Sequence, residues 1–185
     1  FKCVQLFVKE KNEGKGSAVK IGINESRGDF VVIQDADLEY EPNEILRLLE
    51  PSLKQQLGAV YGSRALNTGA SKRLIRLAYP KHPEQYWVSF IGGYILSLWT
   101  LLLFGSYLTD TLTGYKLFDG SLVRGLTLRS KGFELDHEIT TKILRKGKEI
   151  LEVPISYSPR TQLEGKKIRN VDGVKALWTI LKYRF

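Results

Sequence analysis

Three acidic residues on alternate positions follow an apolar run near the start of the sequence. The segment reads VVIQDADLEYEP, and its acids are Asp35, Asp37 and Glu39. In extended backbone, residues two apart point to the same side, so these three carboxylates are expected to converge. Carboxylates that lie close together repel one another unless a cation sits between them, and Mg²⁺ completes its oxygen shell with water and phosphate. The spacing therefore predicts a site for a divalent cation and a diphosphate.

The elements around these acids favour that interpretation. The run FVVIQ before them is continuously apolar, as in a strand that is buried on both faces of a parallel sheet. Open α/β sheets bind their ligands at the carboxyl ends of such strands. A structural role is the alternative, because Asp37 or Glu39 could cap the helix that is expected to begin near Pro42.

Strand and helix patterns alternate over the first third of the chain. This order predicts right-handed crossovers and an α/β fold with a mostly parallel sheet flanked by helices. The last helix is expected to bury Val174, Leu177, Trp178 and Leu181. The expected strands are 1–9, 30–34, 58–63, 114–120 and 149–160, and the expected helices are 17–26, one from residue 42, 134–148 and 171–185.

The overall composition is that of one folded domain with a basic surface. The chain has 185 residues, a net charge of +8 and a single cysteine, so it contains no internal disulfide framework. The charge favours a polyanionic partner, namely nucleic acid, an anionic lipid surface or a phosphate-bearing substrate, with plain solubility as the alternative. Residues 86–108 carry no charge, but their glycines and hydroxyl side chains favour a buried or membrane-apposed helix over a membrane span.

Several motifs occur together in the order of one enzyme family. They are GKGSAVKIGI, GDFVVIQDADLEYEP, GSR, LTDTLTGYKLF, GFELDHEIT and VPISYSPRTQLEGKKI. This series resembles the family-2 inverting glycosyltransferases, and most closely the branch of dolichol-phosphate mannose synthases and bacterial polyprenyl-phosphate glycosyltransferases. The resemblance implies a GT-A-type, Rossmann-like fold over 1–185, with a nucleotide-sugar-binding half at 1–64 and an acceptor-binding half at 65–185. The family's opening strand-helix segment is not found, so we expect the sequence to be a fragment.

The resemblance assigns the donor side of the site. Asp37 matches the principal metal ligand, Asp35 a contact to metal or ribose, and Glu39 a position that completes the coordination of Mg²⁺ or Mn²⁺. Lys15 is placed among the donor-binding residues. In such enzymes the cation neutralises the departing nucleoside diphosphate.

The resemblance also assigns catalytic and acceptor-side residues. Arg64 and Arg160 match arginines that contact phosphate, with a surface ion pair as the alternative for Arg64. Asp110 matches the candidate general base, although a turn or helix cap is an alternative. A lipid monophosphate is largely dianionic at neutral pH, so Asp110 would then orient the acceptor instead of deprotonating it. Lys166 and Lys167 belong to the predicted mobile loop of Arg160, which is expected to fold over the phosphates unless it is simply solvated.

The sequence thus predicts metal-dependent, inverting transfer of a mannose- or glucose-type sugar from a GDP- or UDP-linked donor. The expected acceptor is a polyprenyl or dolichyl phosphate, and the expected location is peripheral, at the cytoplasmic face of a membrane, without nucleic acid as a partner. The alternatives are a family-2 enzyme with a glycan hydroxyl acceptor, a sugar-phosphate nucleotidyltransferase and a basic nucleic-acid-binding module. The sequence fixes neither the nucleotide base nor the oligomeric state.

Overall fold

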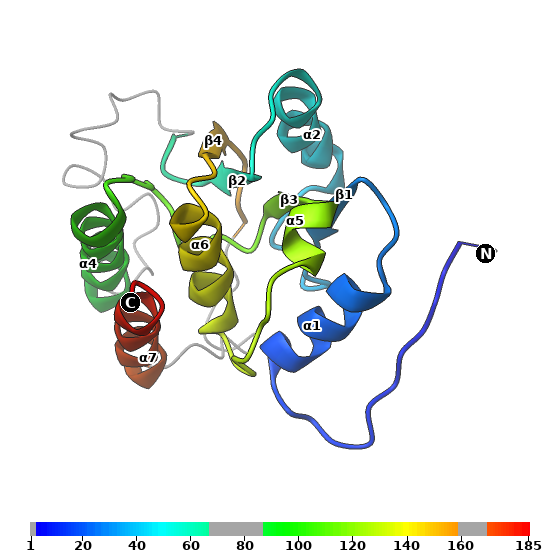
Figure 1. The fold of residues 1–185 in the computed structure, drawn as a ribbon, viewed down its shortest axis with the longest axis horizontal. Helices are drawn as coiled ribbons and strands as arrows, with labels where there is room; N and C mark the ends of the chain where they lie inside the picture. Colours follow the sequence, from blue (N-terminus) through cyan, green and yellow to red (C-terminus); the bar gives the residue numbers. More distant parts are fainter. Residues whose placement is uncertain (1–2, 67–86, 159–169) are drawn as a thin grey trace.

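The computed structural model describes residues 3–66, 87–158 and 170–185, which form a sheet with helices packed around it (Figure 1). The strands are β1 (Phe30–Ile33), β2 (Ala59–Ser63), β3 (Lys116–Asp119) and β4 (Ile150–Pro154). The helices are α1 (Lys15–Glu25), a 3₁₀ turn η1 (Pro42–Glu44), α2 (Ile45–Lys54), α4 (Trp87–Phe104), α5 (Gly120–Arg124), α6 (Leu135–Arg145) and α7 (Asn170–Lys182).

The four described strands form one mixed sheet in the order β1-β3-β2-β4. β3 lies between β1 and β2 and is antiparallel to both, whereas β2 and β4 are parallel. The expectation of a mostly parallel sheet is therefore wrong for the described strands, although the α/β class is correct. Alternation of strands and helices predicted only the first crossovers, and it carried no information on the direction in which a later strand is inserted.

Side chains of each central strand alternate between the two faces of the sheet, as the two-residue period of a strand requires. Tyr61 of β2 and Phe118 of β3 pack on one face, against α1, α5 and α6. Val60 and Leu117 pack on the other face, against α2 through Leu48. Because both faces are covered, the end of β2 emerges from a rigid layer.

The predicted strand at 1–9 is not formed over residues 3–9. Val4, Leu6 and Val8 are instead mostly exposed. An extended segment becomes a stable strand only when a neighbouring strand satisfies its backbone groups, and no described strand pairs with this one. The local apolar pattern was therefore a wrong sign of a strand over these residues.

The C-terminal helix forms as predicted but turns a different side to the core. Ala176 and Ile180 pack with Leu96 of α4, while Val174 and Trp178 are 69% and 63% exposed, so their predicted burial is wrong. α4 and α7 lie side by side at the edge of the molecule (Figure 1). Their exposed apolar residues, here called the α4/α7 apolar face, are Ile91, Ile95, Leu98 and Leu102 on α4 and Val171, Val174 and Trp178 on α7.

The uncharged segment forms the helix α4 over Trp87–Phe104. Within the described ranges, no helix is both long enough and apolar enough to cross a bilayer. Ser97 and Thr100 of α4 are buried and donate their hydroxyls to carbonyl oxygens one turn earlier, those of Gly93 and Leu96. These polar groups lie on the side of α4 that faces the protein, which agrees with the predicted buried or membrane-apposed helix.

Candidate active site

The backbone turns within the acidic segment instead of continuing as a strand. Leu38 has a φ of 61°, a left-handed conformation that is unusual for a branched residue. The turn is held by Asp37, whose Oδ1 accepts the Glu39 N–H at 3.3 Å. Convergence of alternate side chains requires extended backbone, so the turn at Leu38 interrupts it between Asp37 and Glu39. Across residues 3–66, 87–158 and 170–185, no three His, Cys, Asp or Glu side chains are grouped to hold a metal ion.

The alternative role of these acids as helix caps is not observed either. Neither η1 nor α2 has a side-chain hydrogen bond at its N-terminal cap. Asp35, Asp37 and Glu39 all remain partly exposed beyond the end of β1. The residues present therefore fit a cation held by one or two carboxylates and completed by water and a diphosphate, and they do not fit an all-protein cage.

The side chain of Asp35 is held by Lys15 and lies close to the backbone of Gly114. Its Oδ2 accepts a hydrogen bond from Lys15 Nζ at 2.7 Å, which joins two of the predicted donor-side residues. Burial alone would lower the pKa of Lys15, but the carboxylates of Asp136 and Asp35 raise it above its ordinary value. A Cβ at Gly114 would lie 2.8 Å from Asp35 Oδ2, so the absence of a side chain there lets Asp35 approach the segment that follows Asp110.

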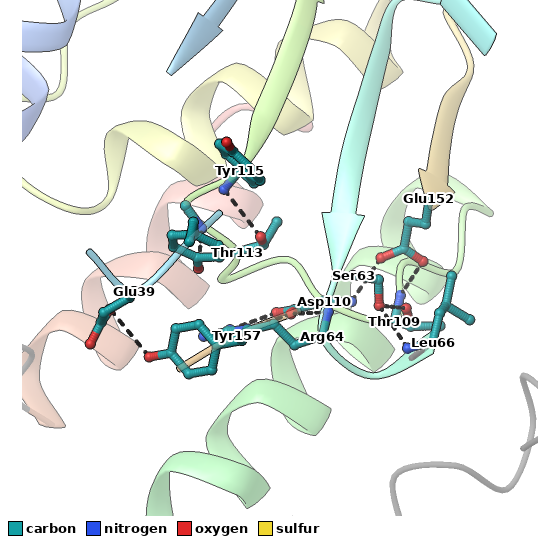
Figure 2. A network of polar contacts seen from close by, with 12 residues as sticks. Glu39, Ser63, Arg64, Leu66, Thr109, Asp110, Thr113, Tyr115, Glu152 and Tyr157 are labelled. Atoms are coloured by element: carbon teal, nitrogen blue, oxygen red, sulfur yellow. Dashed lines mark hydrogen bonds and ion pairs between the residues drawn. The ribbon is translucent and has the colours of Figure 1, made fainter. Parts of the chain in front are cut away.

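Arg64 and Asp110 form a bidentate ion pair beyond the end of β2 (Figure 2). Arg64 Nε donates to Asp110 Oδ2 at 2.6 Å and Nη2 donates to Oδ1 at 2.8 Å, while the Arg64 backbone N–H also donates to Oδ2. The side chain of Asp110 is 2% exposed and that of Arg64 is 25% exposed. Burial opposes the charge on Arg64, but Asp110 outweighs it and raises the Arg64 pKa above its already high value. This pair is not the surface ion pair that was the alternative for Arg64.

A second carboxylate supports the backbone of the Asp110 segment. Glu152 of β4 accepts hydrogen bonds from the N–H groups of Thr109 at 2.6 Å and Asp110 at 2.8 Å (Figure 2). The hydroxyls of Ser63 and Thr109 lie 2.6 Å apart and tie the same segment to the end of β2. Burial raises the pKa of Glu152, and the two N–H groups partly offset that effect. Glu152 was not identified from the sequence, although an acid within the apolar run EILEVP was a signal for it.

Tyr157 joins Arg64 to the acidic segment. The guanidinium carbon of Arg64 lies 4.8 Å from the centre of the Tyr157 ring. The Tyr157 hydroxyl donates to Glu39 Oε2 at 3.3 Å. Burial raises the pKa of Tyr157 to about 12, with Arg64 lowering it and Glu39 raising it, so the hydroxyl keeps its proton at neutral pH. Tyr157 was not identified from the sequence either, although it lies in the quoted motif SYSPR.

A fully buried lysine lies beneath these groups. Lys116 of β3 donates to the Thr113 carbonyl oxygen at 2.7 Å and pairs with Asp136 at 3.2 Å. Burial lowers the Lys116 pKa, and Asp136 partly restores it. Since Asp136 also raises the pKa of Lys15, it contributes to the field on the donor side. The lysine in the apolar strand GYKLF was the sequence signal for this network.

The structure therefore unites most of the predicted site. Lys15 meets Asp35, Arg64 meets Asp110, and Glu39 is connected to Arg64 through Tyr157. Three predicted phosphate-binding residues, Arg160, Lys166 and Lys167, lie outside the described residues. Lys15 lies at the start of α1, Asp35 follows β1, Arg64 follows β2 and Asp110 precedes β3, so four separate segments of the chain contribute these side chains.

Comparison with known proteins gives the class. The model of the family described as glycosyl transferase family 2 matches residues 1–101, which is more than half of the chain. The protein belongs to this family, and the resemblance drawn from its motifs is confirmed.

Among curated relatives, an undecaprenyl-phosphate mannosyltransferase from Micrococcus luteus is 29% identical over 176 residues, covering 92% of this chain and 67% of the relative. A dolichol-phosphate mannosyltransferase from Pyrococcus furiosus is 28% identical over 179 residues, covering 88% and 43%. A UDP-N-acetylglucosamine–dolichyl-phosphate N-acetylglucosaminyltransferase from Methanococcus voltae is 29% identical, covering 93% and 66%. Several of these relatives are therefore considerably longer than the present chain.

Solved structures share the fold. Glucosyl-3-phosphoglycerate synthase from Mycobacterium tuberculosis, in complex with UDP, has a TM-score of 0.63 at 17% identity and covers 92% of this chain and 55% of its own. The same enzyme was crystallised with Mn²⁺, UDP and phosphoglyceric acid. Mannosyl-3-phosphoglycerate synthase from Rubrobacter xylanophilus has a TM-score of 0.59 at 16% identity, covering 94% and 50%. The predicted GT-A-type α/β fold is confirmed by these neighbours.

Proposed function

We propose that the protein transfers a hexosyl group from a nucleoside-diphosphate sugar to a polyprenyl or dolichyl phosphate, with inversion at the anomeric carbon. The observation that carries this proposal is the bidentate Arg64–Asp110 pair. Tyr157 connects this pair to the acidic segment, because its ring contacts Arg64 and its hydroxyl donates to Glu39. Membership of glycosyltransferase family 2 and the lipid-phosphate acceptors in the relatives' names support it.

Arg64 is suited to bind the acceptor phosphate. A guanidinium has five N–H donors in a fixed plane, and the ion pair with Asp110 uses two of them. The remaining donors match the oxygens of a phosphate. The carboxylate of Asp110 and the ring of Tyr157 fix the plane of this guanidinium, so the phosphate would be held in one orientation.

Asp110 then acts as an orienting residue and not as the general base. Both of its oxygens accept hydrogen bonds from Arg64, and its side chain is 2% exposed. A phosphate monoester has a second pKa of about 6, so at neutral pH it is already nucleophilic. Its oxygen bonds to the anomeric carbon as the bond from that carbon to the nucleoside diphosphate breaks, and attack from the opposite face inverts the centre. No proton has to be removed.

The donor side is assigned to Asp35, Asp37, Glu39 and Lys15. When bound, Mg²⁺ or Mn²⁺ would neutralise the charge of the leaving diphosphate at these carboxylates. Lys15 holds Asp35 at 2.7 Å and adds a positive charge on the same side. A phosphate of the donor would therefore meet both a carboxylate-bound cation and an ammonium group.

The α4/α7 apolar face supports a lipid acceptor. Seven large apolar side chains are exposed on two adjacent helices, which is unusual for a surface that faces only water. Lys175 and Lys182 of α7 are exposed near it, and the chain carries a net charge of +8. Apolar side chains with lysines nearby are typical of helices that lie in the surface of an anionic membrane. The protein would thus act peripherally at a membrane surface.

The test is a titration of the protein with GDP and with UDP, each with and without Mn²⁺, followed by a transfer assay. We expect metal-dependent binding of one nucleotide, and transfer of its sugar to undecaprenyl or dolichyl phosphate with inverted configuration. A glycan acceptor and 3-phosphoglycerate are the competing acceptors in the same assay. Transfer to either of these but not to lipid phosphate would refute the proposed acceptor, and binding of neither nucleotide would refute the proposed transferase activity.

A further inference from the structure

Tyr157 occupies a bridging position that the predicted site did not include. Its ring lies under the Arg64 guanidinium, at 4.8 Å from the guanidinium carbon, and its hydroxyl donates to Glu39. The ring also packs against Tyr40, with the ring centres 5.3 Å apart. Tyr40 stacks in turn on Tyr115, at 5.1 Å. Tyr157 is therefore fixed from a third side by an aromatic cluster that is rooted in the core.

Tyr157 contacts one residue assigned to the acceptor and one residue assigned to the donor. Arg64 is assigned to the acceptor phosphate, and Glu39 belongs to the segment that is assigned to the cation and the donor diphosphate. A guanidinium lying over an aromatic face is held by the charge distribution of the ring, which restricts tilting of its plane. A carboxylate that accepts a hydroxyl hydrogen bond is likewise restricted in rotation, and groups that orient metal-binding carboxylates affect metal affinity.

We propose that Tyr157 is a positioning residue with two separable roles. Its ring sets the plane of Arg64 toward the acceptor phosphate, and its hydroxyl orients the Glu39 carboxylate toward the bound cation and diphosphate. The inference deepens the proposed function and rests on it.

The chemistry of tyrosine allows the two roles to be separated by substitution. Tyr157→Phe retains the ring beneath Arg64 and removes only the hydroxyl. Tyr157→Leu removes both the aromatic face and the hydroxyl while keeping an apolar side chain of moderate size. Tyr61→Phe is the matched control, because the Tyr61 hydroxyl is bonded to Thr140 in the core, on the face of the sheet covered by α6.

The experiment compares the wild-type protein with these three variants in two assays. The first is calorimetric titration of GDP or UDP with Mn²⁺, and also of Mn²⁺ alone. The second is the KM for undecaprenyl phosphate at saturating donor. Thermal unfolding of each variant confirms that it is folded.

We expect Tyr157→Phe to weaken Mn²⁺-dependent nucleotide binding about tenfold, with the acceptor KM within twofold of the wild type. Tyr157→Leu should show the same loss on the donor side and, in addition, an acceptor KM raised about fivefold. Tyr61→Phe should change neither quantity. The split between the two assays is the signature of positioning, because a general loss of stability would not separate donor from acceptor.

Two results would overturn the inference while leaving the proposed function intact: wild-type levels of both quantities in Tyr157→Phe and Tyr157→Leu, or an equal change of both quantities in the two variants. Failure of the wild-type protein to bind either nucleotide refutes the proposed function itself and the Tyr157 roles with it. The two failures are therefore distinguishable within one set of titrations.

Discussion

The Arg64–Asp110 pair should show strong energetic coupling in a double-mutant cycle. Arg64→Met leaves the Asp110 carboxylate, which is 2% exposed, without its cation. Removing one partner of a buried pair costs about 3–5 kcal/mol. Asp110→Asn leaves a guanidinium whose side chain is 25% exposed, so water offsets part of the loss and we expect about 2–3 kcal/mol.

The double variant, Arg64→Met with Asp110→Asn, removes both charges and so leaves no buried charge without a partner. Its cost should therefore be about 3 kcal/mol, well below the sum of the single costs, which corresponds to a coupling of about 2 kcal/mol or more. The assay is urea unfolding at neutral pH, with the slope against urea checked for constancy across the set. Additivity within about 0.5 kcal/mol would refute the geometry of the pair.

The same variants distinguish an orienting Asp110 from a general base. If Asp110 orients Arg64, Asp110→Asn should raise the acceptor KM and leave the shape of the pH–rate profile unchanged. If Asp110 is the base, kcat should fall by about 10²-fold or more at unchanged acceptor KM, and the acidic limb of the profile should disappear. The second pattern would contradict the mechanism proposed above.

Three further predictions concern the metal, the membrane face and acid stability. Asp37→Ala should abolish the Mn²⁺-dependent part of nucleotide binding, measured by titration, whereas persistence of that part would contradict the donor-side assignment. Trp178→Ser should reduce binding to anionic vesicles about tenfold in a sedimentation assay. Leu46→Ser is the control, since Leu46 is also exposed but lies on α2, and it should leave vesicle binding unchanged. Burial and the nearby Lys116 lower the pKa of His137 from 6.5 to about 4. As the pH falls from about 6.5 to about 4, His137 becomes protonated in the unfolded chain but stays neutral in the native state. The free energy of unfolding should therefore fall by about 3 kcal/mol as the pH is lowered across this window. Urea unfolding against pH measures it, and an equally steep fall in His137→Gln would exclude His137 as its cause.

Local patterns were reliable where one segment carries its own information. The run FVVI before the acids, the apolar run AVY and the amphipathic helix around Ile139 all formed close to their expected places. The motifs also determined the family, since residue types at fixed spacings reflect the chemistry that they must perform. Lys15, Arg64 and Asp110 were proposed as site residues in this way, each from a short stretch of sequence.

Burial of the helix faces could not be read reliably from the same patterns. Val174 and Trp178 satisfy the helical period of a buried face, yet they are exposed. The side of α7 that is buried depends on where α4 and α6 lie, and residues of intermediate polarity such as Ala176 and Thr179 face them instead. An apolar stripe shows that a helix has an apolar side, but it does not show which partner covers that side.

What the sequence determined by itself was the class of chemistry: acids after an apolar strand, an arginine and an aspartate in family motifs, and the strands and helices that carry them. What only the tertiary structure decided was the partnership of these groups. The left-handed turn at Leu38 redirects the acidic segment, and β3 inserts antiparallel between β1 and β2. Glu152 of β4 and Tyr157 of the segment after β4 then reach the Arg64–Asp110 pair. Spacing along the chain specifies only neighbours within one element, whereas contacts between distant segments depend on the packing of the whole sheet.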